Sequence, residues 1–109
     1  MSEFVDYLAE LFEGFGAVRS RRMFGGYGLY HRDVMFALVS DDVLYLKADD
    51  ALAELFETRG LPPFQYPKGD RIVALSYYEA PPELFDDPDA AATWARRAYA
   101  AAVAAKQRR

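Results

Sequence analysis

Apolar residues at the start of the chain recur at the spacing of one helical face. These positions are Phe4, Leu8, Leu11, Phe12 and Phe15. Acidic residues lie between them, so one face can pack against a core while the other faces water. The pattern predicts an amphipathic helix that ends near the glycines at positions 14 and 16.

Three runs rich in aromatic and branched residues follow, separated by short polar turns. They are Tyr27–His31, Val34–Val39 and Val43–Ala48. Such residues favour extended structure, and the short turns allow neighbouring strands to pair, so an antiparallel meander is predicted. The middle run is apolar at every position, which indicates a strand inside the sheet that is buried on both faces.

Helix and strand signals alternate again after residue 48. The acidic pair at positions 49 and 50 can cap a short helix over Ala51–Arg59, and Gly60 can end it in a left-handed conformation. Two strands, Phe64–Tyr66 and Arg71–Tyr78, flank a turn composed of Pro, Lys, Gly and Asp. These features predict a second hairpin after the short helix.

The last helix has a well-defined start. Asp87 fits the N-cap and Pro88 the first helical position, and the alanine-rich segment that follows favours helix. Trp94, Ala98 and Ala102 form one apolar stripe along it. The predicted order is therefore α-β(3)-α-β(2)-α.

This order, with 52% apolar residues in 109, predicts one α+β domain over residues 1–109 in which helices and an antiparallel sheet form two layers. The helices suffice to cover one face of the sheet. We therefore expect some apolar surface to remain and predict a tendency to form a homodimer.

The composition excludes several classes of site. The chain has no cysteine and a single histidine, His31, so thiol chemistry, iron–sulfur clusters and multi-histidine metal sites are excluded, and we expect neither a metal nor a cofactor. We expect His31 to be a surface residue near a turn. The N-terminal segment is acidic and no apolar run is long enough to span a membrane, so we expect a cytoplasmic protein that does not bind membranes.

The net charge of −4 is unfavourable for a broad nucleic-acid-binding surface. Bases are nevertheless concentrated in two places. One is the segment with Arg19, Arg21 and Arg22, and the other is the C-terminal segment from Arg96 onward, which has no acid. The C-terminal cations fit the negative end of a helix dipole, or they could contact phosphate.

The arginine segment is the strongest candidate site. Arg19, Arg21 and Arg22 precede Met23 and Phe24, and two interpretations stay open. The arginines either protect an exposed sheet edge from pairing or bind an acidic or phosphate-bearing partner. The glycines that follow, at positions 25, 26 and 28, do not complete a dinucleotide fingerprint, so we expect them to permit a bend or a close backbone approach.

Tyr77, Tyr78 and Glu79, with Lys47 nearby, include groups that could act in acid–base chemistry. In strands, however, the same composition is typical of cross-strand packing with a charge at the rim. No catalytic residues are predicted, and we expect the protein not to be an enzyme.

Five segments together carry a family resemblance. They are "RRMFGGYGLY", "VMFALV", "LYLK", "PFQY" and "VALSYYEAPPEL…DDPDAAATWARRA". The most specific are Arg22–Gly26 and Tyr77–Pro82, and the sequence resembles the TfoX N-terminal domain of the TfoX/Sxy competence regulators. The resemblance implies an antiparallel sheet of secretion-chaperone-like topology and a role in the transcriptional regulation of natural competence. We therefore expect a regulatory domain that acts through protein–protein interaction, with weak nucleic-acid binding through the two basic segments as the alternative.

Overall fold

The computed structural model describes residues 2–23 and 25–108. In this part of the chain the elements are α1 (Glu3–Leu11), β1 (Arg19–Met23), β2 (Gly26–His31), β3 (Val34–Ser40), β4 (Val43–Lys47), α2 (Asp50–Thr58), β5 (Pro63–Lys68), β6 (Arg71–Glu79), a 3₁₀ turn (Pro82–Leu84) and α3 (Pro88–Gln107). No helix in these ranges combines the length and apolarity that crossing a lipid bilayer requires.

The strands form one antiparallel sheet in the order β1-β2-β3-β4-β6-β5. The predicted α+β class is confirmed, as is the position of β3 inside the sheet. The prediction of three strands before the middle helix is wrong, because the arginine segment itself forms β1 and pairs with β2. Pairing with a neighbouring strand stabilises an extended segment that its own sequence does not favour.

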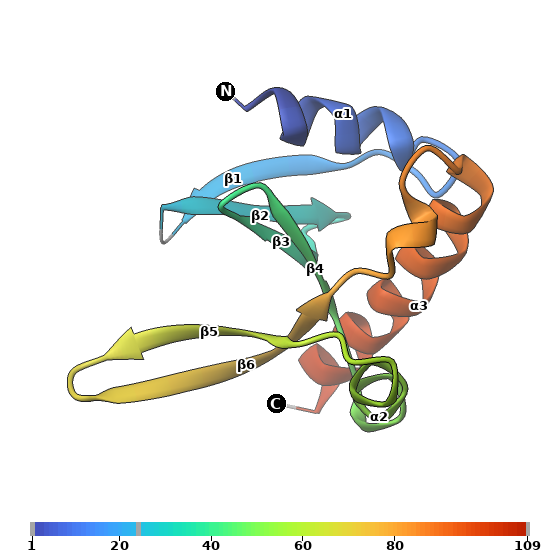
Figure 1. The fold of residues 1–109 in the computed structure, drawn as a ribbon. Helices are drawn as coiled ribbons and strands as arrows, with labels where there is room; N and C mark the ends of the chain where they lie inside the picture. Colours follow the sequence, from blue (N-terminus) through green and yellow to red (C-terminus); the bar gives the residue numbers. More distant parts are fainter. Residues whose placement is uncertain (1, 24, 109) are drawn as a thin grey trace.

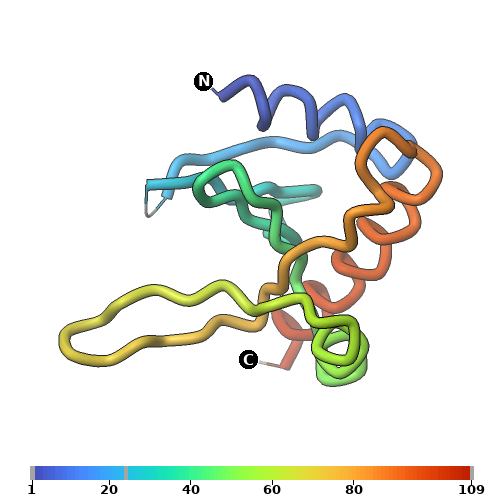
Figure 2. Tube along the Cα trace, in the orientation of Figure 1, coloured from blue at the N-terminus to red at the C-terminus, as the bar shows by residue number. Residues whose placement is uncertain are grey.

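The two faces of the sheet differ in what covers them. Across one face, register places Ser20, Leu29, Ala37, Leu46 and Tyr78 in one row. All but Ser20 are buried, because the helices pack on this side (Figures 1 and 2). The opposite row is Arg21, Gly28, Leu38, Tyr45 and Glu79. No described helix packs across the middle of this second side, which we call the open face. Gly28 and Leu38 on it are buried by neighbouring side chains, and the C-terminal end of α3 borders it near Tyr77.

Small residues let α3 lie close to the sheet. Its buried positions are Ala91, Ala92, Ala95, Ala98, Ala101 and Ala102. Aromatic pairs fill the space beside this stripe: the rings of Phe12 and Phe36 lie 5.8 Å apart, and those of Phe56 and Trp94 lie 5.6 Å apart. Asp87 accepts a hydrogen bond from the Ala90 amide, which confirms the predicted N-cap.

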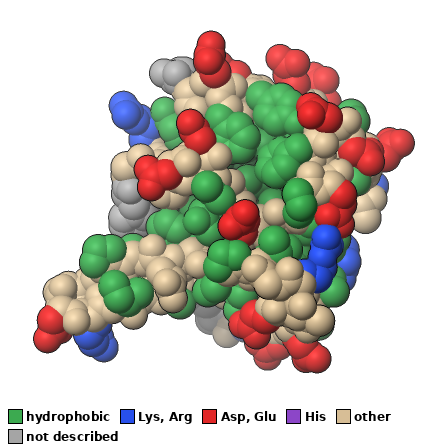
Figure 3. All heavy atoms as spheres, in the orientation of Figure 1, with side chains coloured by type: hydrophobic (Ala, Val, Ile, Leu, Met, Phe, Trp, Pro, Cys, Tyr) green, Lys and Arg blue, Asp and Glu red, His purple; other side chains and the backbone are tan. Residues whose placement is uncertain are grey.

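Strands β5 and β6 continue beyond the rest of the sheet as a projecting hairpin (Figures 1 and 3). We call the part of it that spans residues 65–74 the arm. Ile72 on the arm is 65% exposed, and its register partner is Pro67. The projection therefore presents apolar side chains to solvent.

Candidate functional site

The three arginines of the candidate site lie on β1, at one end of the strand order. Arg19 approaches Asp33 at 3.9 Å, and both side chains are highly exposed. The Arg21 guanidinium lies 5.6 Å from the centre of the Tyr30 ring. The Arg22 side chain forms no hydrogen bond or ion pair with another described residue. Exposed pairs of this kind are weak, so all three cations are accessible to a partner.

Glycines make the β1–β2 turn possible. Met23 pairs with Gly26, and Gly25 has a φ of 75°, a left-handed conformation that suits glycine. A Cβ atom on Gly26 would overlap the carbonyl oxygen of Val39 on β3. The expected close backbone approach is thus confirmed. Phe24 lies outside the described residues.

Methionine and aromatic side chains cover the open face beside the arginines. A Cβ on Gly28 would lie 2.8 Å from the sulfur of Met23 and 3.0 Å from that of Met35, so both thioethers lie over this glycine. Tyr30 is near the same position. Methionine adapts its shape readily, and a surface of methionine and tyrosine is typical of protein-binding sites.

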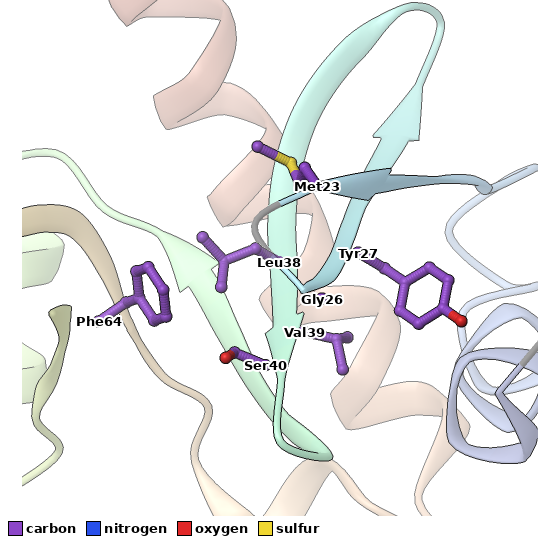
Figure 4. A pocket seen from close by; sticks show the side chains of 7 residues that line it. All are labelled: Met23, Gly26, Tyr27, Leu38, Val39, Ser40 and Phe64. Atoms are coloured by element: carbon purple, nitrogen blue, oxygen red, sulfur yellow. The ribbon is translucent and has the colours of Figure 1, made fainter. Parts of the chain in front are cut away.

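The depression at this end of the sheet is too small for an organic ligand. It is lined by Met23, Gly26, Tyr27, Leu38, Val39, Ser40 and Phe64 (Figure 4). Leu38 and Phe64 point toward one another, whereas Tyr27 points away from them. The enclosed space is about 10 Å³, about the room of one water molecule.

Tyr77 lies on the open face, and its hydroxyl donates to the carbonyl of Met35 at 3.3 Å. Burial raises the pKa of this hydroxyl to about 12, with a smaller contribution from Tyr30. The Lys47 ammonium lies 5.1 Å from the centre of the Tyr77 ring, and the two residues are register partners. Cross-strand packing is therefore confirmed for this pair.

Tyr78 faces the helices instead. Its hydroxyl donates to Glu57 Oε2 at 2.6 Å, and this hydrogen bond, followed by burial, raises the pKa of Tyr78. Glu79 pairs with Tyr45, whose pKa is raised by burial and then by Glu79. The Tyr77–Glu79 motif thus connects β6 to β3, β4 and α2, and none of its contacts involves the arginines of β1.

The two basic segments approach the same corner of the sheet. A surface depression of about 550 Å³ is lined by Tyr30, Asp33 and Arg19, among others. A second, of about 340 Å³, shares Tyr30 and Asp33 and includes Lys47 and Lys106 of α3. Asp33, which lines both depressions, reduces the positive potential between Arg19 and Lys106.

His31 lies beside the turn at residues 32 and 33 and lines a surface depression, as expected, and its ring also packs against two aromatic rings. It is half-buried, with its ring 4.6 Å from that of Phe15 and 5.0 Å from that of Tyr99. Its Nδ1 is 2.8 Å from the Ala17 carbonyl oxygen. In the ranges 2–23 and 25–108, no group of three His, Cys, Asp or Glu residues is arranged to hold a metal.

Sequence reasoning missed the part of the site that lies on the open face. Tyr30, Met35, Leu38 and Tyr45 come from three strands, and only register shows that they share this face with Arg21. An alternation of apolar and polar residues would have shown which side chains share a face. In β3 this signal is absent, because every residue from Val34 to Val39 is apolar. The twofold periodicity is visible in β4, where Leu44 and Leu46 are buried and Tyr45 is not.

The fold and the site define a small α+β domain that covers one face of its sheet with helices and presents the other, with a basic edge strand, to its surroundings. A sequence profile of the TfoX N-terminal domain matches residues 10–102, and the chain belongs to this family. The chain is 35% identical over 86 residues to the DNA transformation protein TfoX1 of Aliivibrio fischeri, a match covering 75% of this chain and 41% of that protein. It is 36% identical over 80 residues to the protein Sxy of Escherichia coli, covering 73% of this chain and 36% of Sxy. The matches thus span about two fifths of these relatives, and the chain is related to the TfoX and Sxy competence proteins.

Proposed function

We propose that this chain is a non-enzymatic, cofactor-free regulatory domain that acts mainly through protein contacts, in the manner of an N-terminal module of competence transcriptional regulators. The relation to TfoX1 and Sxy supports the regulatory part of the proposal. A cytoplasmic location is part of it, since regulators of transcription act in the compartment that holds the DNA.

One observation carries the protein-binding part. The accessible arginines of β1 lie directly beside an open face covered by Met23, Met35 and Tyr30. Interface centres are enriched in methionine, aromatic residues and arginine, whereas a catalytic site needs a cavity that holds its substrate. The depression beside Met23 and Leu38 is too small to serve as such a cavity, and the two larger depressions that Tyr30 borders lie open on the surface.

Crosslinking in cells that express the chain tests this proposal. The wild type would be compared with Arg19→Glu/Arg21→Glu/Arg22→Glu and with a matched control, Lys68→Glu/Arg71→Glu/Arg96→Glu, which reverses the same number of exposed cations elsewhere. We expect the wild type and the control to crosslink to the same specific protein and the β1 variant to lose it. Equal recovery with all three chains, or recovery of no specific protein, would contradict the proposal.

Weak nucleic-acid binding is the second candidate. It is favoured by the shared corner, where Arg19 and Lys106 border two depressions that have Tyr30 in common. Phosphate contacts need several cations on one surface, and Asp33 lies between these two. The net charge of −4 further weakens attraction to a duplex.

A further inference from the structure

The two edges of the sheet differ in their ability to accept another strand. β5 contains Pro63 and Pro67, each of which removes a backbone N–H donor. β1 contains no proline, and it is bonded on one side only, to β2. Among the described residues, no backbone group from position 19 to 23 forms a hydrogen bond outside this ladder. β1 therefore presents alternate N–H and C=O groups along its outer edge.

A groove lies beside this edge, between β1 and α1. It has a volume of about 310 Å³ and is lined by Val5, Asp6, Ala9, Val18, Arg19, Ser20 and Leu29. The helix runs alongside the strand in Figure 1. A strand added to β1 would point every second side chain into this groove, and small apolar side chains match its lining.

The side chains on the other face of an added strand would meet different chemistry. Arg19 and Arg21 share the open face, since they are two residues apart on one strand. In an added antiparallel strand, the side chains that lie on the open face would be about 5 Å from these arginines. Acidic side chains are therefore favoured on that face, whereas Asp6 disfavours them in the groove.

A second copy of this chain does not fit the edge. Antiparallel pairing of β1 with another β1 would place arginines opposite or diagonal to arginines, and directly opposed like charges destabilise a sheet. The complementary occupant is an acidic segment of a different protein.

We propose that β1 accepts, by strand addition, an extended partner segment in which acidic and apolar residues alternate. This inference rests on the proposed function and specifies how the partner binds. Backbone hydrogen bonds to the edge supply affinity, and the groove and the arginines select the alternating pattern.

Synthetic ten-residue peptides test the inference with the full chain. One alternates Asp and Val, a second has the same composition in two blocks, and a third alternates Lys and Val. NMR titration of ¹⁵N-labelled protein would follow the amides of residues 19–23. We expect the Asp/Val peptide to shift and protect these amides and to bind at least about tenfold more tightly than the other two peptides.

Backbone methylation separates strand addition from attraction between charges. One version of the Asp/Val peptide would carry N-methyl groups on its Asp residues, and a second version would carry them on its Val residues. Because the backbone N–H groups of alternate residues point to opposite edges of a strand, each version lacks the N–H donors along one edge of the peptide. We expect one version to lose at least about tenfold in affinity and the other to retain it. Equal affinity of both versions would overturn strand addition.

Variants of the protein complete the test. The Arg19→Glu/Arg21→Glu/Arg22→Glu chain should lose peptide binding while its thermal unfolding stays cooperative, and Arg21→Lys should retain most of it. Binding of a short DNA duplex in preference to the Asp/Val peptide would overturn the inference. If the β1 variant loses a crosslinked partner in cells but the peptides bind without pattern preference, strand addition is wrong while the proposed function stands. If no specific partner is crosslinked, the proposed function itself fails.

Discussion

Gly26 lies directly against the carbonyl oxygen of Val39, so that β2 and β3 approach each other where no side chain fits between them. The conflict is with the backbone, which cannot move aside as the end of a flexible side chain can. Gly26 has no positive φ, so space, and not backbone conformation, requires glycine here.

The first prediction follows from this contact. Gly26→Val should destabilise the fold by about 1–3 kcal/mol, because the added atoms force the two strands apart. Urea unfolding measures the change. Gly14→Ala is the control, since its Cβ would meet Ala92 at an ordinary 3.7 Å. Gly25→Ala should cost about 1 kcal/mol through its positive φ alone. Wild-type stability of Gly26→Val would show that the strands can separate freely.

The second prediction concerns the ionisation of Tyr77. Its folded-state pKa of about 12 lies above the ordinary value of 10.0, so the stabilisation from keeping it neutral is complete below about pH 10 and is lost as the pH rises through 12. Tyr77→Phe should therefore lose less stability than the wild type between about pH 9 and about pH 11.5. Urea unfolding at both pH values tests this, with Tyr66→Phe on the arm as the control. If the wild type and Tyr77→Phe lost the same unfolding free energy between these pH values, ionisation of Tyr77 would not be the cause of the loss.

The third prediction concerns the hydrogen bond between Tyr78 and Glu57, which links β6 to α2. Tyr78→Phe keeps the ring contact with Phe56 and removes only the hydroxyl, so we expect a loss of about 0.5–1.5 kcal/mol in unfolding free energy. A double-mutant cycle with Glu57→Gln would isolate the pair. A coupling energy near zero would show that water replaces the bond without cost.

The fourth prediction is that the isolated domain does not detectably bind a short DNA duplex near physiological salt. Non-specific binders show dissociation constants of about 10⁻⁴–10⁻⁶ M under such conditions, and the negative net charge opposes even this. Fluorescence anisotropy with a labelled duplex measures it. Micromolar binding that is lost when Arg19, Arg21 and Arg22 become alanine would favour the nucleic-acid function instead.

The fifth prediction is weak self-association through the arm. Ile72 is exposed, and removing it from water against a second copy gains hydrophobic free energy. Sedimentation should give a mass that rises with concentration, and Ile72→Lys should reduce the rise. Thr58→Lys adds the same charge on α2 and serves as the control. A wild-type mass independent of concentration would refute self-association.

The sequence predicted those elements whose signals are local. The caps at Asp49 and Asp87, the left-handed Gly60 and the apolar run of β3 act within a few residues, and the structure confirms all of them. The family was also evident from short motifs, and the profile match confirms it. The secretion-chaperone-like topology stays a prediction.

Only the tertiary structure decided what β1 is and what surrounds it. Arg19–Met23 has little intrinsic strand preference, and it is extended because β2 offers a ladder of hydrogen bonds. Register then brings Tyr30 and Met35 to the same face as Arg21, although no sequence spacing connects them. The sequence by itself determined the elements and the three candidate arginines, because capping, turn chemistry and hydrophobic periodicity are local. The edge, the open face and the groove beside α1 depend on strand pairing between distant segments, and that pairing was decided by the packing of the whole chain.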